Sequence, residues 1–129
     1  MEKEFEQKSR KLLMFDLEQD KLKEYYPKPS ASTNPQYHTK AYKDIEIFFR
    51  NSDWEHKQGS GYISNQEISS YDIVNLLFKM VIQMPWLGKC ISNFDIGIAP
   101  KLHDYKDTIQ SITSYIEEKD ITHRSTPEQ

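Results

Sequence analysis

The chain has 129 residues, of which 36% are hydrophobic and 29% charged, and its formal net charge is −3 at pH 7. This length suits one domain with a sizeable core, and no apolar run approaches the length of a membrane span. The negative net charge argues against strong nonspecific binding of nucleic acid, although it allows a local basic patch. We therefore expect a soluble, single-domain protein that does not enter a membrane.

Residues 1–9 are polar and mixed in charge, and they lack the apolar region of a signal peptide. We expect them to form a flexible extension of a cytoplasmic protein. The single cysteine, Cys90, cannot form an internal disulfide, which suits a reducing compartment. The four histidines are scattered without zinc-site spacing, so we expect no stable transition-metal site.

The segment Lys11–Leu17 carries five apolar residues in six positions, which predicts a strand buried on both faces at the centre of a sheet. Asp16 interrupts this apolar run. A carboxylate at the end of a buried strand has to be hydrogen-bonded, paired, metal-bound or open to solvent. The spacing of Asp16 and Gln19 also fits a capping box for a short helix over residues 17–26, and this structural role stays open beside a functional one.

The next three segments carry local signals of their own. Three prolines within residues 27–35 predict an exposed loop, and the apolar spacing of residues 36–51 predicts a helix that covers a sheet. Trp54–Gln58 and residues 62–64 have β-type composition and flank Gly59-Ser60-Gly61. This pattern predicts a hairpin, because glycine readily adopts the positive φ that a tight connection requires.

Ser69 and Asp72 form a variant capping box before the most apolar helix of the chain, which ends at Pro85. Its apolar residues occupy more than one stripe, so we expect it to pack on the sheet and also on the C-terminal segment or another subunit. Residues 94–99 alternate as a half-buried strand does. A final helix is predicted over residues 104–118.

These elements follow the order strand, helix, strand, strand, helix, strand, with one extra C-terminal helix. They predict an α+β fold of the ferredoxin-like βαββαβ type, with a four-stranded antiparallel sheet whose first and third strands are central. The domain would span residues 10–116, between the extension 1–9 and a tail at 117–129. Both helices lie on one face of such a sheet, and a symmetric dimer often hides the other face.

Several segments, taken together and in this order, resemble the VapD proteins, which are small bacterial endoribonucleases related in fold to ferredoxin-like CRISPR-associated nucleases. The resemblance covers roughly residues 12–116. It rests on Phe15-Asp16-Leu17, residues 40–45, residues 58–62, the segment at Trp86, Asp95-Ile96 and residues 104–107.

The resemblance implies a homodimer in which the catalytic Asp16 lies close to its counterpart in the partner subunit. Such facing carboxylates bind a divalent metal such as Mg²⁺, or one of them acts as a general base on the 2′-hydroxyl of RNA. No organic cofactor is implied. The hairpin residues Gln58, Gly59, Ser60 and Tyr62 would contact the substrate: Ser60 and backbone groups would hold a phosphate, and Tyr62 would either stack on a base or pack in the core. A turn-forming role for the same hairpin stays open.

The implied partners are single-stranded RNA as substrate and an antitoxin protein, because VapD proteins are often treated as toxins. VapD proteins usually carry arginines around the last strand, where this chain has residues 92–98 without arginine. Lys40, Lys43 and Lys57 are the lysines we consider as compensating charges. The alternative function is a noncatalytic ferredoxin-like dimer that binds nucleic acid or an antitoxin, with Asp16 acting as a helix cap.

Overall fold

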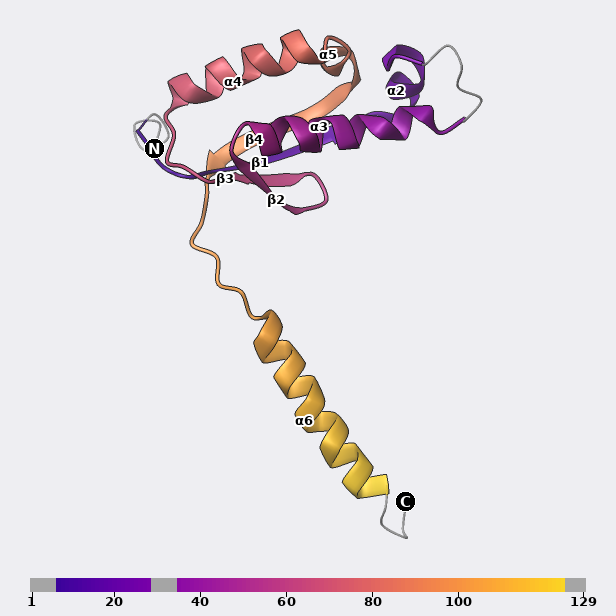
Figure 1. Cartoon of the computed structure of the whole chain (residues 1–129), viewed down its shortest axis with the longest axis vertical. Coiled ribbons are helices and arrows are strands. Elements are labelled where there is room, and N and C mark those ends of the chain that lie inside the picture. The colour runs from indigo at the N-terminus through magenta and orange to yellow at the C-terminus, as the bar shows by residue number, and fades with distance from the viewer. Residues whose placement is uncertain (1–6, 29–34, 125–129) are drawn as a thin grey trace.

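The computed structural model describes residues 7–28 and 35–124 (Figure 1). Within them, four strands form one antiparallel sheet in the order β2-β3-β1-β4. The strands are β1 Lys11–Leu17, β2 Trp54–Gln58, β3 Gly61–Ser64 and β4 Ile91–Ile98. The first and third strands are central, which confirms the predicted ferredoxin-like α+β arrangement.

The helices match the sequence pattern with shifts at their ends. They are α2 Gln19–Tyr25, the 3₁₀ helix η1 Tyr37–Thr39, α3 Lys40–Asn51, α4 Ser70–Gln83, α5 Leu87–Cys90 and α6 Lys106–Arg124. The helix predicted over 36–51 therefore begins as a 3₁₀ turn, and the last strand begins three residues earlier than predicted. Of the predicted loop 27–35, residues 29–34 lie outside the described residues.

The central strand β1 is buried on one face, which corrects the prediction that both faces are buried. Leu13, Phe15 and Leu17 are buried, whereas Met14 is 54% exposed and Asp16 is also exposed. Side chains alternate along a strand, and within the described residues the helices that pack on the sheet cover the face that carries Phe15. In a single chain Met14 and Asp16 therefore lie on an open sheet face.

Aromatic side chains fill the space between the sheet and α3. The ring of Phe15 lies 6.2–6.4 Å from those of Tyr42, Tyr62 and Phe94, measured between centroids. Phe49 of α3 lies 4.6 Å from Tyr62. Burying a side chain of this size contributes about 1.5–3 kcal/mol, so these rings fix the register of β1 and β3 against α3.

Two contacts, one local and one between distant segments, lie where helices begin. The capping box predicted for α4 is present, since Ser69 and Asp72 each accept a hydrogen bond from the backbone of the other. The backbone N–H of Glu18 donates to the carbonyl of Cys90, at 2.8 Å, which joins the end of β1 to α5. Cys90 itself is fully buried.

The two ends of the described chain behave differently. Ser9 pairs with Ile68 through two backbone hydrogen bonds of 2.9 and 3.1 Å, so the last part of the expected extension joins the body. At the other end α6 continues six residues beyond the predicted residue 118, because residues 119–124 contain no glycine or proline. Its side chains from Lys106 to Asp120 are exposed, and the helix projects away from the body (Figure 1).

Candidate functional site on the open sheet face

Asp16 lies near the end of β1 on the open face, where its carboxylate makes no hydrogen bond or ion pair within the described residues. The predicted capping role is wrong. The N-cap of α2 is Glu18, and no side chain accepts a hydrogen bond there. The Glu18 N–H is bonded to Cys90 and the backbone at Glu18 is extended, so α2 does not begin directly after Asp16.

A second carboxylate lies beside Asp16 in the same chain. Asp16 pairs with Asn93 of β4, and Met14 pairs with Asp95. Directly opposite residues of an antiparallel pair point to the same face, so Asp16 and Asp95 are diagonal neighbours, with Cβ atoms about 7–8 Å apart or somewhat less. Asp95 was not among the predicted site residues. The alternation of β4 would have placed Asp95 on the polar face, but only the register shows that it lies beside Asp16.

The β2–β3 hairpin brings part of the predicted substrate site to these carboxylates. An open groove of about 890 Å³ is lined by Asp16, Asp95, Gln58 and Ser60, among others. Gly59 adopts φ +53°, the left-handed conformation that the turn needs, and its carbonyl lies 2.6 Å from Nε2 of His56. The predicted residues Asp16, Gln58 and Ser60 thus share one groove, while Gly59 shapes the turn beside it.

Tyr62, the remaining predicted substrate residue, lies on the opposite face of the sheet. Only 3% of it is exposed, and its ring packs against Phe15, Phe49 and His56. Burial, with a smaller contribution from the negative charge of Glu46, raises the pKa of Tyr62 to about 12. Of the two roles considered for Tyr62, this position favours packing over base stacking.

A second groove, of about 460 Å³, continues along the open face toward the start of β1. It is lined by the basic residues Lys8, Arg10, Lys57 and Lys101 together with one acidic residue, Glu67. The two grooves have Lys57, Ile63 and Leu102 in common. The open face is therefore acidic at one end and basic at the other.

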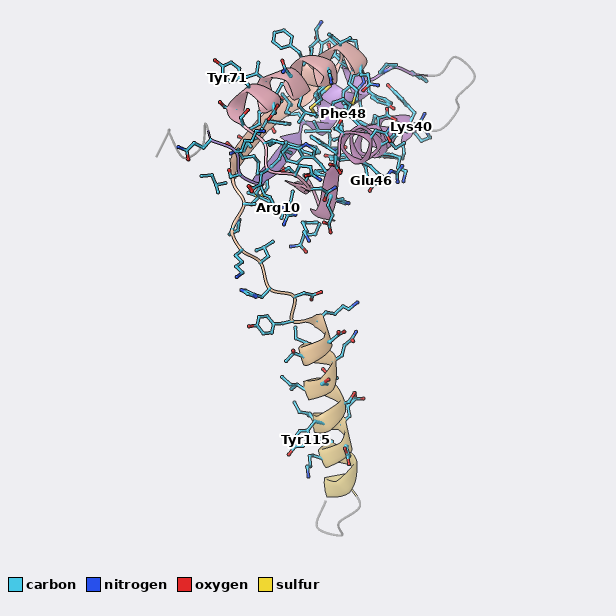
Figure 2. The ribbon with its side chains drawn as sticks, turned by 60° about the vertical axis from the view of Figure 1, so that its left-hand side comes forward. Arg10, Lys40, Glu46, Phe48, Tyr71 and Tyr115 are labelled. Carbon is cyan, nitrogen blue, oxygen red and sulfur yellow. The ribbon has the colours of Figure 1, made fainter. Side chains whose placement is uncertain are left out.

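The basic groove contains cations that sequence reasoning missed. Arg10 is positioned by a hydrogen bond of 2.9 Å from its Nε to the carbonyl of Ser64, and Lys101 follows the last strand. Among the lysines considered earlier, Lys57 lines both grooves, whereas Lys40 and Lys43 belong to α3. Figure 2 shows Arg10 and Lys40 in separate parts of the body. The sequence does not show that these cations form a group, because Lys8 and Arg10 are far from Lys101 along the chain. They come together because the start of β1 pairs with the end of β4.

The donor set of the acidic groove suits a hard cation. Asp16 and Asp95 offer carboxylate oxygens, and Asn93 offers an amide oxygen. Mg²⁺ is commonly held by one or two carboxylates together with waters and substrate phosphate. In the described part of the chain, no cluster of three or more His, Cys, Asp or Glu side chains is arranged to hold a metal. The residues present therefore fit Mg²⁺ held jointly with a phosphate, and do not form a complete protein cage.

The sequence matches no protein-family model and has no significant match among curated proteins. Within residues 7–28 and 35–124, no helix combines the length and the apolar character needed to cross a membrane. The fold and the two grooves together define a ferredoxin-like α+β domain with a charged, open sheet face.

Proposed function

We propose that the chain is an endoribonuclease of the VapD type that cleaves single-stranded RNA in the acidic groove, with Asp16 as the catalytic residue. The observation that carries the proposal is the arrangement of the open face: two neighbouring carboxylates, polar hairpin residues beside them, and a basic groove that continues from the same site. Phosphate contacts from the basic groove position a strand, and the carboxylates act on it.

In the proposed reaction the carboxylate of Asp16 accepts the proton of an RNA 2′-hydroxyl. The 2′-oxygen attacks the adjacent phosphorus, the bond from phosphorus to the 5′-oxygen breaks, and the leaving 5′-oxygen takes up a proton from water. The products are a 2′,3′-cyclic phosphate and a 5′-hydroxyl. Ser60 and Gln58 line the same groove and would orient the phosphate by hydrogen bonding.

A divalent metal fits the same site. Asp16 and Asp95 would hold Mg²⁺, with the amide oxygen of Asn93 nearby, and the bound ion would neutralise charge on the phosphate. No organic cofactor is part of the proposal. The presence of Asp95 means that one chain already supplies two carboxylates, so the site does not need the Asp16 of a partner subunit to form a pair.

A homodimer, a toxin role and an antitoxin partner also belong to the proposal, and they rest on the VapD resemblance. The alternative is a noncatalytic dimer that binds nucleic acid or a protein. The exposed apolar side chains of α4 favour a protein partner in either case. In the alternative Asp16 is no longer a helix cap, because the structure gives that position to Glu18.

The test is cleavage of a labelled single-stranded RNA by the wild-type chain and by Asp16→Asn and Asp95→Asn variants, each with Mg²⁺ and with a chelator. We expect Asp16→Asn to lower the cleavage rate at least about 100-fold, the range lost with a general base. Asp95→Asn should lower it as well. The matched control is Asp107→Asn, which removes the same charge from an exposed position on α6 and should leave the rate unchanged.

The chelator separates the two chemical roles of the carboxylates, since only a metal-dependent reaction stops in its presence. A DNA strand of the same sequence should resist cleavage if the 2′-hydroxyl is the nucleophile. An inactive wild-type chain that still binds RNA would replace the nuclease proposal with the noncatalytic alternative. Equal activity of the wild type and Asp16→Asn would remove Asp16 from the mechanism.

A further inference from the structure

Helix α4 has two apolar faces, and only the inner one is packed. Ile73, Leu76 and Met80 point into the core and are at most 9% exposed. The outer face carries large apolar side chains that are 49–83% exposed, at the 3–4 spacing of one helical stripe: Tyr71, Val74, Phe78, Val81 and Ile82. An apolar stripe of this size on a small protein indicates a binding surface.

Helix α6 carries a stripe of the same kind. Tyr105, which directly precedes the helix, and Ile109, Ile112 and Ile116 within it follow one another at intervals of four, three and four residues, and each is 53–63% exposed. The backbone N–H of Lys106 donates to the carboxylate of Asp104, at 2.8 Å, which caps the start of the helix. Most helical stability in proteins comes from packing of an apolar face, so α6 needs a surface to pack on.

The path of the linker keeps α6 away from α4 of its own chain. Leu102 lines both grooves on the open sheet face, and only three residues separate it from Lys106. The four Cα–Cα steps from Leu102 to Lys106 span at most about 14 Å. The sheet and the full thickness of α4 separate the outer face of α4 from the open face of the sheet, a distance of about 15–20 Å. Tyr71 of α4 and Tyr115 of α6 are accordingly far apart in Figure 2.

The open sheet face is also a poor surface for α6. It carries Asp16, Asp95, Arg10 and Lys57, and burying these charges under isoleucine side chains would leave them without water. The outer stripe of α4 offers an apolar surface of matching periodicity, and α4 and α6 run for 14 and 19 residues. A second copy of this chain carries the same α6 at the end of the same projecting linker.

We propose that α6 of each chain packs on the outer face of α4 of a second copy, so that two copies exchange these helices about a two-fold axis. Two such contacts would cover on the order of 2,000 Å², above the roughly 1,200 Å² found at the small end of stable interfaces. The carboxylate groove lies on the opposite side of the sheet from α4 and stays open in this dimer. The inference is independent of the proposed nuclease function.

The test measures the mass of the full chain in solution by light scattering after gel filtration. We expect twice the 15.3 kDa of one chain for the wild type. Phe78→Lys on α4 and Ile112→Glu on α6 should each give a monomer, with dimer affinity lowered at least about 100-fold. The matched control is Gln110→Glu, which adds the same charge to the other side of α6 and should stay dimeric. Phe78 and Ile112 are both exposed in the single chain, so neither substitution disturbs the core. Circular dichroism checks that each variant is folded.

Mixing the two monomeric variants gives the decisive result. In the exchanged dimer, a Phe78→Lys chain and an Ile112→Glu chain form one unchanged contact and one contact that pairs lysine with glutamate. We therefore expect the mixture to recover a dimer. A monomeric wild type would overturn the proposal. Loss of the dimer with only one of the two variants would also overturn it, since that result indicates pairing of α4 with α4 or of α6 with α6.

Discussion

Replacing Arg10 and Lys101 with glutamine should weaken the salt dependence of RNA binding by a calculable amount. The basic groove places Lys8, Arg10, Lys57 and Lys101 along one path beside the carboxylates. For single-stranded nucleic acid the logarithm of the affinity falls with the logarithm of salt concentration, with a slope of about −0.7 per neutralised phosphate. Four contacts give a slope of about −2.8, and the double variant should give about −1.4.

These slopes predict clearly different losses over an accessible range. A fourfold rise in salt should lower the affinity about 50-fold with four contacts and about 7-fold with two. The assay is fluorescence anisotropy of a labelled single-stranded RNA, with Asp16→Asn as the background so that the strand is not cleaved. Lys40→Gln is the matched control, because it removes an exposed positive charge at the start of α3.

The control should keep the full slope. If the Arg10 and Lys101 double variant keeps it too, the basic groove does not hold phosphates, and the path proposed for RNA is wrong. An equal reduction by Lys40→Gln would show that binding depends on net charge alone. Neither result bears on the cleavage test of Asp16, which reads a rate and not an affinity.

Two stability changes follow from the same structure, both measured by urea unfolding. Tyr62→Ala should lower the free energy of unfolding by about 3–5 kcal/mol because it empties a packed aromatic site, whereas Ser60→Ala two residues away should change it by less than about 0.5 kcal/mol. Ser69→Ala should cost about 1 kcal/mol at neutral pH. Hydrogen bonds from Ser69 hold the pKa of Asp72 below its ordinary value, so Asp72 stabilises the fold above its unfolded pKa and loses that effect as pH falls through its folded pKa. The difference between wild type and Ser69→Ala should therefore shrink in acid.

Local signals in the sequence predicted most of the fold. The apolar run of β1, the glycines of the hairpin and the Ser69–Asp72 box each depend on residues close together in the chain, and each element lies where it was predicted. The strand order followed from the order of these elements. An apolar run does not indicate whether one face of the sheet or both are covered by helices. Met14 was therefore expected in a core, whereas it lies on the open face.

The site was predictable only in part, because its composition depends on register. Asp16 was recognised as a carboxylate that interrupts an apolar strand. Its neighbour Asp95 is 79 positions away and joins it through the pairing of β1 with β4. Ser60 lies in the turn of the hairpin and lines the groove, whereas Tyr62 belongs to β3, pairs with Leu13 of β1 and shares its buried face. The capping role of Asp16 failed because a distant carbonyl, that of Cys90, keeps the chain extended through Glu18.

The burial of Cys90 makes this protein convenient for chemical labelling. Its thiol is inaccessible, and burial, together with the negative charges of Glu18 and Glu24, raises its pKa above the ordinary value, so the reactive thiolate is scarce. No other cysteine occurs in the sequence. One cysteine introduced on the surface would therefore be the single reactive thiol under native conditions. A dye or spin label could then be attached to α6 or to the hairpin without replacing Cys90.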